Sequence, residues 1–151
     1  MYRRLLVLVF AAMACLGPAA SAAGRPMSVE DLLRLQRISD PQISPDGNRV
    51  LYTVATANLD ANANESNLWL ASTNGAPARQ LTYSGKDRSA RWSPDGKLIA
   101  FLSRRDGKSQ VYLLPVEGGE ALALAKTWMN IETLRWSPDG ASIAFPILRW
   151  D

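Results

Sequence analysis

The sequence has no histidine, and its single cysteine, Cys15, lies in an apolar stretch near the N-terminus. A serine or cysteine nucleophile usually needs histidine as the base that takes its proton. The Gly-x-Ser-x-Gly elbow that presents the serine of many hydrolases does not occur either. With one cysteine, the chain forms no internal disulfide and no thiolate metal site. We therefore predict no catalytic residue in this sequence.

Glycine-rich loops and paired carboxylates, which could bind a cofactor or run acid and base chemistry, are weakly represented. Gly118 and Gly119 lack a following helix and the Lys-Ser or Lys-Thr pair of a phosphate-binding loop. The closely spaced carboxylates lie beside expected caps and turns, where solvated charge is usual. These carboxylates are Glu30, Asp31, Glu117 and Glu120. We predict no cofactor-binding residue.

A metal site is not predicted either. Residues 60–64 read Asp-x-Asn-x-Asn, and such alternating oxygen side chains open a calcium-binding loop. The match then fails, because Glu65 stands where that loop needs glycine and Ala71 where it needs a bidentate glutamate. We expect residues 56–66, rich in alanine and asparagine, to form a solvated surface loop.

The charge pattern argues against a nucleic-acid partner. The formal net charge is +3, but Arg3 and Arg4 lie in a segment that we expect to be removed. Without them, 15 lysines and arginines face 14 aspartates and glutamates. Scattered charges of both signs give no footprint for nucleic acid or for an anionic membrane.

Residues 1–23 have the layout of a secretory signal peptide. Two arginines precede an apolar run of 12 residues at 5–16, and small residues follow. We expect cleavage after Ala22 or Ala23 and export to the periplasm or the extracellular space. The run is shorter than the roughly 20 residues that span a bilayer, so we expect no stable membrane anchor.

Two other interpretations of this N-terminal segment remain open. Arg3 and Arg4 could form a twin-arginine export signal, although the apolar run begins directly after them. Cys15 could be a lipidated cysteine, but Ala12 replaces the leucine that such a site prefers. A buried apolar cysteine inside the leader is the simpler interpretation.

A linker and one short helix are predicted for residues 24–40. Ser28 and Asp31 have the spacing of a capping box, and leucines at 32, 33 and 35 form an apolar stripe. The helix should end by Asp40, because Pro41 disfavours the helical conformation in the residue before it. A helix this short needs a larger partner, so we expect it to cap the edge of the following strands.

The tetrapeptide Ser-Pro-Asp-Gly occurs three times, at residues 44–47, 93–96 and 137–140. Proline presets φ at the first corner position, aspartate accepts backbone N–H groups, and glycine takes the position with positive φ. Each copy therefore predicts a turn that joins two strands. The aspartate is assigned to backbone hydrogen bonding and the serine to the strand end.

The copies are 49 and 44 residues apart, a spacing typical of propeller blades. Each unit has four short segments with the period of strands. Besides the strand that enters each turn, these segments are 49–55, 67–71, 79–82, 98–103, 111–114 and 121–125. We predict an all-β fold of four-stranded antiparallel blades. Residues 41–151 should form two blades and the start of a third, an incomplete propeller preceded by one short helix.

Large aromatic residues recur at fixed places in the repeat. Trp92 and Trp136 precede the second and third turns, and Phe101 and Phe145 lie in the strands that follow. They could form a ligand platform, but stacked blades need large residues to fill the space between them. We favour core packing.

The turns, the Arg-Trp-Ser-Pro-Asp-Gly form of the last two, and the helix that leads directly into the first unit resemble one family. They resemble the N-terminal part of secreted serine peptidases of the prolyl oligopeptidase family, in the dipeptidyl and acylaminoacyl peptidase branch. The resemblance covers residues 27–145. The turn repeat also occurs in TolB-like periplasmic propellers, but those place a separate α/β domain before the propeller.

The resemblance implies a β-propeller that covers a C-terminal α/β-hydrolase domain carrying the catalytic serine, aspartate and histidine. In such enzymes the propeller admits only short peptides. No catalytic motif has a matching position here, so the chain is expected to be the non-catalytic N-terminal fragment, inactive alone. The alternative is a TolB-like propeller that binds a protein partner. An open array exposes apolar blade faces, so we expect the chain alone to be poorly soluble or partly unfolded.

Overall fold

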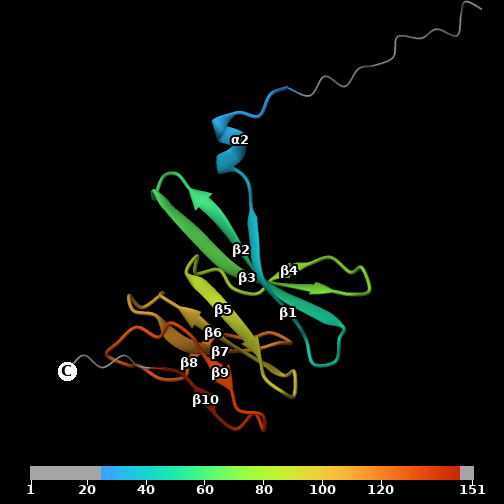
Figure 1. The fold of residues 1–151 in the computed structure, drawn as a ribbon, viewed down its shortest axis with the longest axis vertical. Coiled ribbons are helices and arrows are strands. Elements are labelled where there is room, and N and C mark those ends of the chain that lie inside the picture. Colours follow the sequence, from blue (N-terminus) through green and yellow to red (C-terminus); the bar gives the residue numbers. More distant parts are fainter. Residues whose placement is uncertain (1–24, 147–151) are drawn as a thin grey trace, which may run out of the picture.

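The computed structural model describes residues 25–146, and the predicted signal peptide at 1–23 lies outside them. One helix, α2 (Val29–Leu33), precedes a chain of strands (Figure 1). The first sheet has the order β1 (Arg37–Ile43), β2 (Arg49–Asn58), β3 (Ala63–Ser72) and β4 (Arg79–Gln80). The second has the order β5 (Asp87–Trp92), β6 (Leu98–Ser103), β7 (Gln110–Pro115) and β8 (Leu122–Ala123). A third pairs β9 (Arg135–Trp136) with β10 (Ile143–Ala144).

These sheets confirm the predicted all-β fold of four-stranded antiparallel blades, open and incomplete. We call β1–β4 blade 1, β5–β8 blade 2, and β9–β10 the third sheet. All neighbouring strands within a sheet run antiparallel. In the described residues no helix is long and apolar enough to cross a membrane.

Each Ser-Pro-Asp-Gly turn closes the first hairpin of its sheet, as predicted. In blade 2, the Ser93 hydroxyl donates to Asp95 at 2.6 Å and accepts from the backbone N–H of Leu98 at 2.9 Å. The Asp95 carboxylate accepts from the backbone N–H of Lys97, and Gly96 has a φ of +71°. The other two copies repeat these bonds. Serine and aspartate therefore hold a corner.

The first strand begins earlier than the sequence pattern predicted. Strand β1 begins at Arg37, whereas strands were expected from Pro41 onward. Its register with β2 shifts between Ser39 and Gln42, and Asp40 there has a φ of +51°. Such a β-bulge leaves a residue unpaired, so Pro41, which has no N–H, fits inside the strand without breaking the ladder.

The surface loop expected at residues 56–66 is mostly a hairpin, so that prediction is wrong. Strands β2 and β3 continue pairing to Asn58 and Ala63, and Asn62 takes a φ of +46° in the turn between them. The Asn58 side chain accepts from the N–H of Ala61 at 3.0 Å and donates to Glu65 at 2.6 Å. Cross-strand pairing has therefore overridden the weak strand propensity of alanine and asparagine.

The hydrophobic core lies between the blades, because consecutive residues of β6 point to opposite faces of blade 2. Ile99 and Phe101 pack with residues of blade 1 such as Leu51 and Leu68. The opposite face packs with the segment that leads into the third sheet, and Trp136 and Phe145 join it. Trp92 packs against the first cluster. The prediction that the repeated aromatics form core is confirmed.

The helix α2 has the predicted capping box but does not pack as predicted. The N–H of Asp31 donates to the Ser28 hydroxyl, and the N–H of Ser28 donates to the Asp31 carboxylate at 2.9 Å. No residue of α2 is buried, and Leu32 is 54% exposed. Figure 1 shows α2 beyond the β2–β3 hairpin, away from blade 2. Glu30 and Leu33 border a hollow together with Leu59 at the end of the β2–β3 hairpin, so α2 lies beside blade 1 without being buried against it.

Candidate functional site

The first strands of the three sheets lie side by side and form the inner edge of the array. Strand β5 contacts both β1 and β9, whereas β4 and β8 lie far apart (Figure 1). In a propeller the innermost strands of the blades surround the central channel. The surface of β1, β5 and β9 is therefore the candidate functional surface, because any molecule in the channel meets these strands first.

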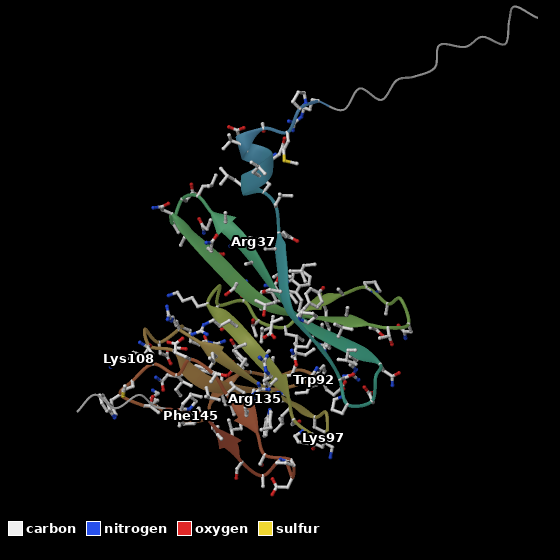
Figure 2. The ribbon with its side chains drawn as sticks, viewed as in Figure 1. Arg37, Trp92, Lys97, Lys108, Arg135 and Phe145 are labelled. Atoms are coloured by element: carbon white, nitrogen blue, oxygen red, sulfur yellow. The ribbon has the colours of Figure 1, made fainter. Side chains whose placement is uncertain are left out.

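Tryptophan indoles join neighbouring sheets along this inner edge. The indole N–H of Trp92 donates to the carbonyl of Gln42 at 3.2 Å, and that of Trp136 donates to the carbonyl of Arg91 at 3.1 Å. Each tryptophan directly precedes its turn serine, and each acceptor lies two residues before the turn serine of the preceding sheet. Figure 2 labels Trp92 where β5 approaches β1. The repeat of the tryptophans in the sequence predicted that they pack in the core, but it did not predict these hydrogen bonds.

An ion pair reinforces the inner edge between blades 1 and 2. The Arg91 guanidinium contacts the Asp40 carboxylate at 2.7 Å, and the side chains are 25% and 30% exposed. Gln42 donates its amide N–H to the other oxygen of Asp40 at 3.1 Å. The β-bulge of β1 presents Asp40 toward blade 2. Sequence reasoning missed this pair, because the partners are 51 residues apart and meet only after the blades stack.

A second charged pair lies in blade 2 and joins a buried aspartate to a partly exposed arginine. Asp87 is fully buried, and the Arg105 guanidinium donates to its Oδ1 at 3.1 Å. The Oδ2 atom has no hydrogen-bond partner among the described residues. The same guanidinium lies 4.5 Å from the centre of the Tyr112 ring. Burial and a hydrogen bond to Asp106 raise the pKa of Tyr112 to about 12, so this phenol stays neutral near neutral pH.

The aspartates of the three turns are ionised structural groups. The serine hydroxyl of each turn, followed by a backbone N–H group, lowers the pKa of Asp46, Asp95 and Asp139 below the ordinary value. A carboxylate whose charge is stabilised by donors is a weak base. This chemistry fits a corner and does not fit proton transfer.

The carboxylates weighed from the sequence are not brought together. Glu30 and Asp31 lie in α2, whereas Glu117 lies in the turn between β7 and β8 and pairs with Arg49 of blade 1 at 2.8 Å. Glu120 is exposed in the same turn. Within residues 25–146, no group of three or more acidic, histidine or cysteine side chains is placed to hold a metal ion.

Several curated relatives that match this chain have peptidase names, including the following two. A protein of Bacillus subtilis named uncharacterized peptidase YuxL is 37% identical over 101 residues, which are 65% of this chain and 15% of the relative. Dipeptidyl-peptidase 5 of Porphyromonas gingivalis is 30% identical over 94 residues, 62% of this chain and 14% of that protein. The chain thus spans about one seventh of the length of each relative.

The fold also matches a solved propeller. The β-propeller domain of the trilobed protease of Pyrococcus furiosus, described as having an open velcro topology, aligns with a TM-score of 0.62 at 24% identity. The match covers 75% of this chain and 34% of that one. The model of the TolB beta propeller domain matches residues 34–148, well over half of the sequence. The chain therefore belongs to the TolB beta-propeller domain family.

Proposed function

We propose that this chain is the non-catalytic propeller part of an exported serine peptidase that acts on short peptides. The observation that carries the proposal is that this chain is 37% identical over 101 residues to a protein named as a peptidase, of which it covers only 15%. The catalytic serine, aspartate and histidine would then belong to a C-terminal α/β-hydrolase domain. The absence of histidine from this sequence is consistent with catalytic residues that lie in another domain.

In this proposal the propeller restricts access to the active site. The inner strands β1, β5 and β9 would line the channel through which a substrate passes. The Trp92 and Trp136 bonds and the Arg91–Asp40 pair tie adjacent sheets together at this edge. A channel whose wall is fixed in this way would admit a short extended peptide and exclude a folded protein.

The proposal includes export and the division of the chain. Residues 1–23 would be a signal peptide cleaved after Ala22 or Ala23, and the segment from residue 24 to residue 36 would connect it to the propeller part, which begins with β1 at Arg37 and not at residue 41. The peptidase would then act in the periplasm or outside the cell. N-terminal sequencing of the protein recovered from the periplasm or the medium measures the cleavage position.

A propeller that binds a protein partner, without enzymatic activity, is the second candidate. It is supported by the match to a family model named after TolB. The two candidates differ in what accompanies the propeller. Reading the gene beyond codon 151 tests them, because the first requires a Gly-x-Ser-x-Gly elbow followed by aspartate and histidine. A frame that closes the propeller and ends without these motifs would contradict the peptidase proposal.

A further inference from the structure

A cationic hollow lies at the end of blade 2 opposite its Ser-Pro-Asp-Gly turn. Its volume is about 380 Å³, and three basic side chains, two polar ones and two glycines line it. The lining residues are Asn64, Ser66, Gly85, Lys86, Arg88, Arg104 and Gly107. Lys108 directly follows the lining residue Gly107, and Lys97 directly follows the Ser-Pro-Asp-Gly turn. Figure 2 labels these two lysines on opposite sides of blade 2.

Two basic residues of the hollow, Lys86 and Arg104, lie close together although like charges repel each other. Asp87 pairs with Ser103, and the N–H of Arg104 donates to the carbonyl of Lys86 at 3.1 Å, so Lys86 and Arg104 lie opposite each other one residue beyond the ends of β5 and β6. Like charges directly opposite destabilise a sheet. Proteins break local rules of this kind mainly at functional sites.

Two carboxylates border the hollow, and they balance only part of the positive charge of its three basic side chains. Glu132 accepts from Arg88 at 3.1 Å and lies 4.0 Å from Arg104. Glu65 lies beside Gly85 and accepts from Asn58 at 2.6 Å. Among the described residues, Lys86 has no ion-pair partner. Glu132 also shows that a carboxylate fits between the two guanidinium groups.

We propose that this hollow is a subsite that binds a carboxylate of the peptide substrate. Lys86 supplies a point charge, Arg104 a planar pair of donors, and Asn64 and Ser66 neutral hydrogen bonds. The choice of a peptide as the source of the carboxylate rests on the proposed function, whereas the binding of an anion rests on the geometry alone.

The site is tested by calorimetric titration, which does not depend on catalysis. The protein expressed from its complete reading frame is titrated with glutarate and, separately, with inorganic phosphate. We expect Lys86→Gln and Arg104→Gln each to weaken glutarate binding roughly tenfold, since each removes a charge-assisted bond. Glu132→Gln should tighten binding, because it removes the competing internal carboxylate. Lys97→Gln, at the opposite end of blade 2, is the matched control and should bind as the wild type does.

Paired peptides with a free or an amidated C-terminus then identify the source. We expect kcat/KM to fall roughly tenfold on amidation in the wild type, and to be insensitive to amidation in Lys86→Gln. Absence of glutarate and phosphate binding overturns the subsite. Tighter binding of phosphate, with no effect of amidation, overturns its assignment to peptide carboxylates. Glutarate binding without cleavage of any peptide would contradict the proposed function and leave the anion site standing.

Discussion

Each Ser-Pro-Asp-Gly corner uses its serine hydroxyl and its aspartate to hold the backbone of the next two residues. The aspartate accepts both the serine O–H and a backbone N–H, so its charged form is favoured in the folded chain. The pKa of Asp95 is consequently lowered, first by Ser93 and then by the N–H of Lys97. The serine and the aspartate of each corner, which are joined by a hydrogen bond, therefore stabilise the turn.

The lowered pKa values make the corners sensitive to acid. A carboxylate whose folded pKa lies below its unfolded value of about 3.9 contributes stability above that pH and loses it as the pH falls through the folded value. We compare the wild type with a triple variant that combines Asp46→Asn, Asp95→Asn and Asp139→Asn. We expect the melting temperature of the full-length protein to fall more steeply below about pH 4 in the wild type than in the triple variant. Asparagine keeps the acceptor oxygen but does not titrate there. Parallel pH profiles of the two proteins would contradict this role.

The buried Asp87 carboxylate depends on one guanidinium. We expect Arg105→Met to lower the free energy of unfolding by about 3–5 kcal/mol, because it leaves a charge buried and unpaired. Urea unfolding of the full-length protein, followed by tryptophan fluorescence, measures this loss.

Two matched variants sharpen the test of Asp87. Arg104→Met removes the neighbouring, 54% exposed arginine and should cost less than about 1 kcal/mol. Asp87→Asn added to Arg105→Met should recover most of the stability, since a neutral amide is less costly to bury. Equal effects of the two arginine variants would show that Asp87 does not need its partner.

At the scale of elements, the indole N–H of each turn-preceding tryptophan links one sheet to the sheet before it. We expect Trp92→Phe and Trp136→Phe each to cost about 0.5–1.5 kcal/mol, because phenylalanine keeps an aromatic ring and loses the hydrogen bond. Trp128→Phe is the control, since Trp128 is 74% exposed. Urea unfolding of the three variants measures the difference, and equal stabilities would argue that only the ring matters.

Most elements could be predicted from the sequence, because local chemistry determines them. Proline, aspartate and glycine specify the corners, and the capping box specifies where α2 begins. The bulge at Asp40 and the long β2–β3 hairpin could not be predicted, since cross-strand pairing decides both. Nor could the exposure of Leu32, which depends on where the helix lies relative to the blades.

The candidate surface was less predictable than the fold. The repeat predicted which strands enter each turn, but not that Arg91 would meet Asp40 across the seam. The cationic hollow joins β3, the segment before β5, and the turn after β6. Only the stacking of blades brings these segments together, and no local pattern in the chain records it.

At the scale of the whole molecule, blades 1 and 2 leave apolar side chains exposed. Ile38 and Ile43 of β1 are 68% and 71% exposed. Ile43 occupies the place that Trp92 and Trp136 hold in the other sheets, where they contact the preceding sheet. We expect residues 24–151 expressed alone to associate or to unfold in part. Analytical ultracentrifugation with thermal unfolding measures this, and a monomer with one sharp transition would contradict it.

The proposed function makes this propeller part of a serine peptidase. To test this proposal, hydrolysis of short chromogenic peptides is measured for the protein expressed from its complete reading frame, with and without a serine-directed inhibitor. We predict cleavage of the short peptides that the inhibitor abolishes, and no cleavage of a folded protein. A purified, folded protein that cleaves none of these peptides would contradict the account and favour a propeller that only binds a partner.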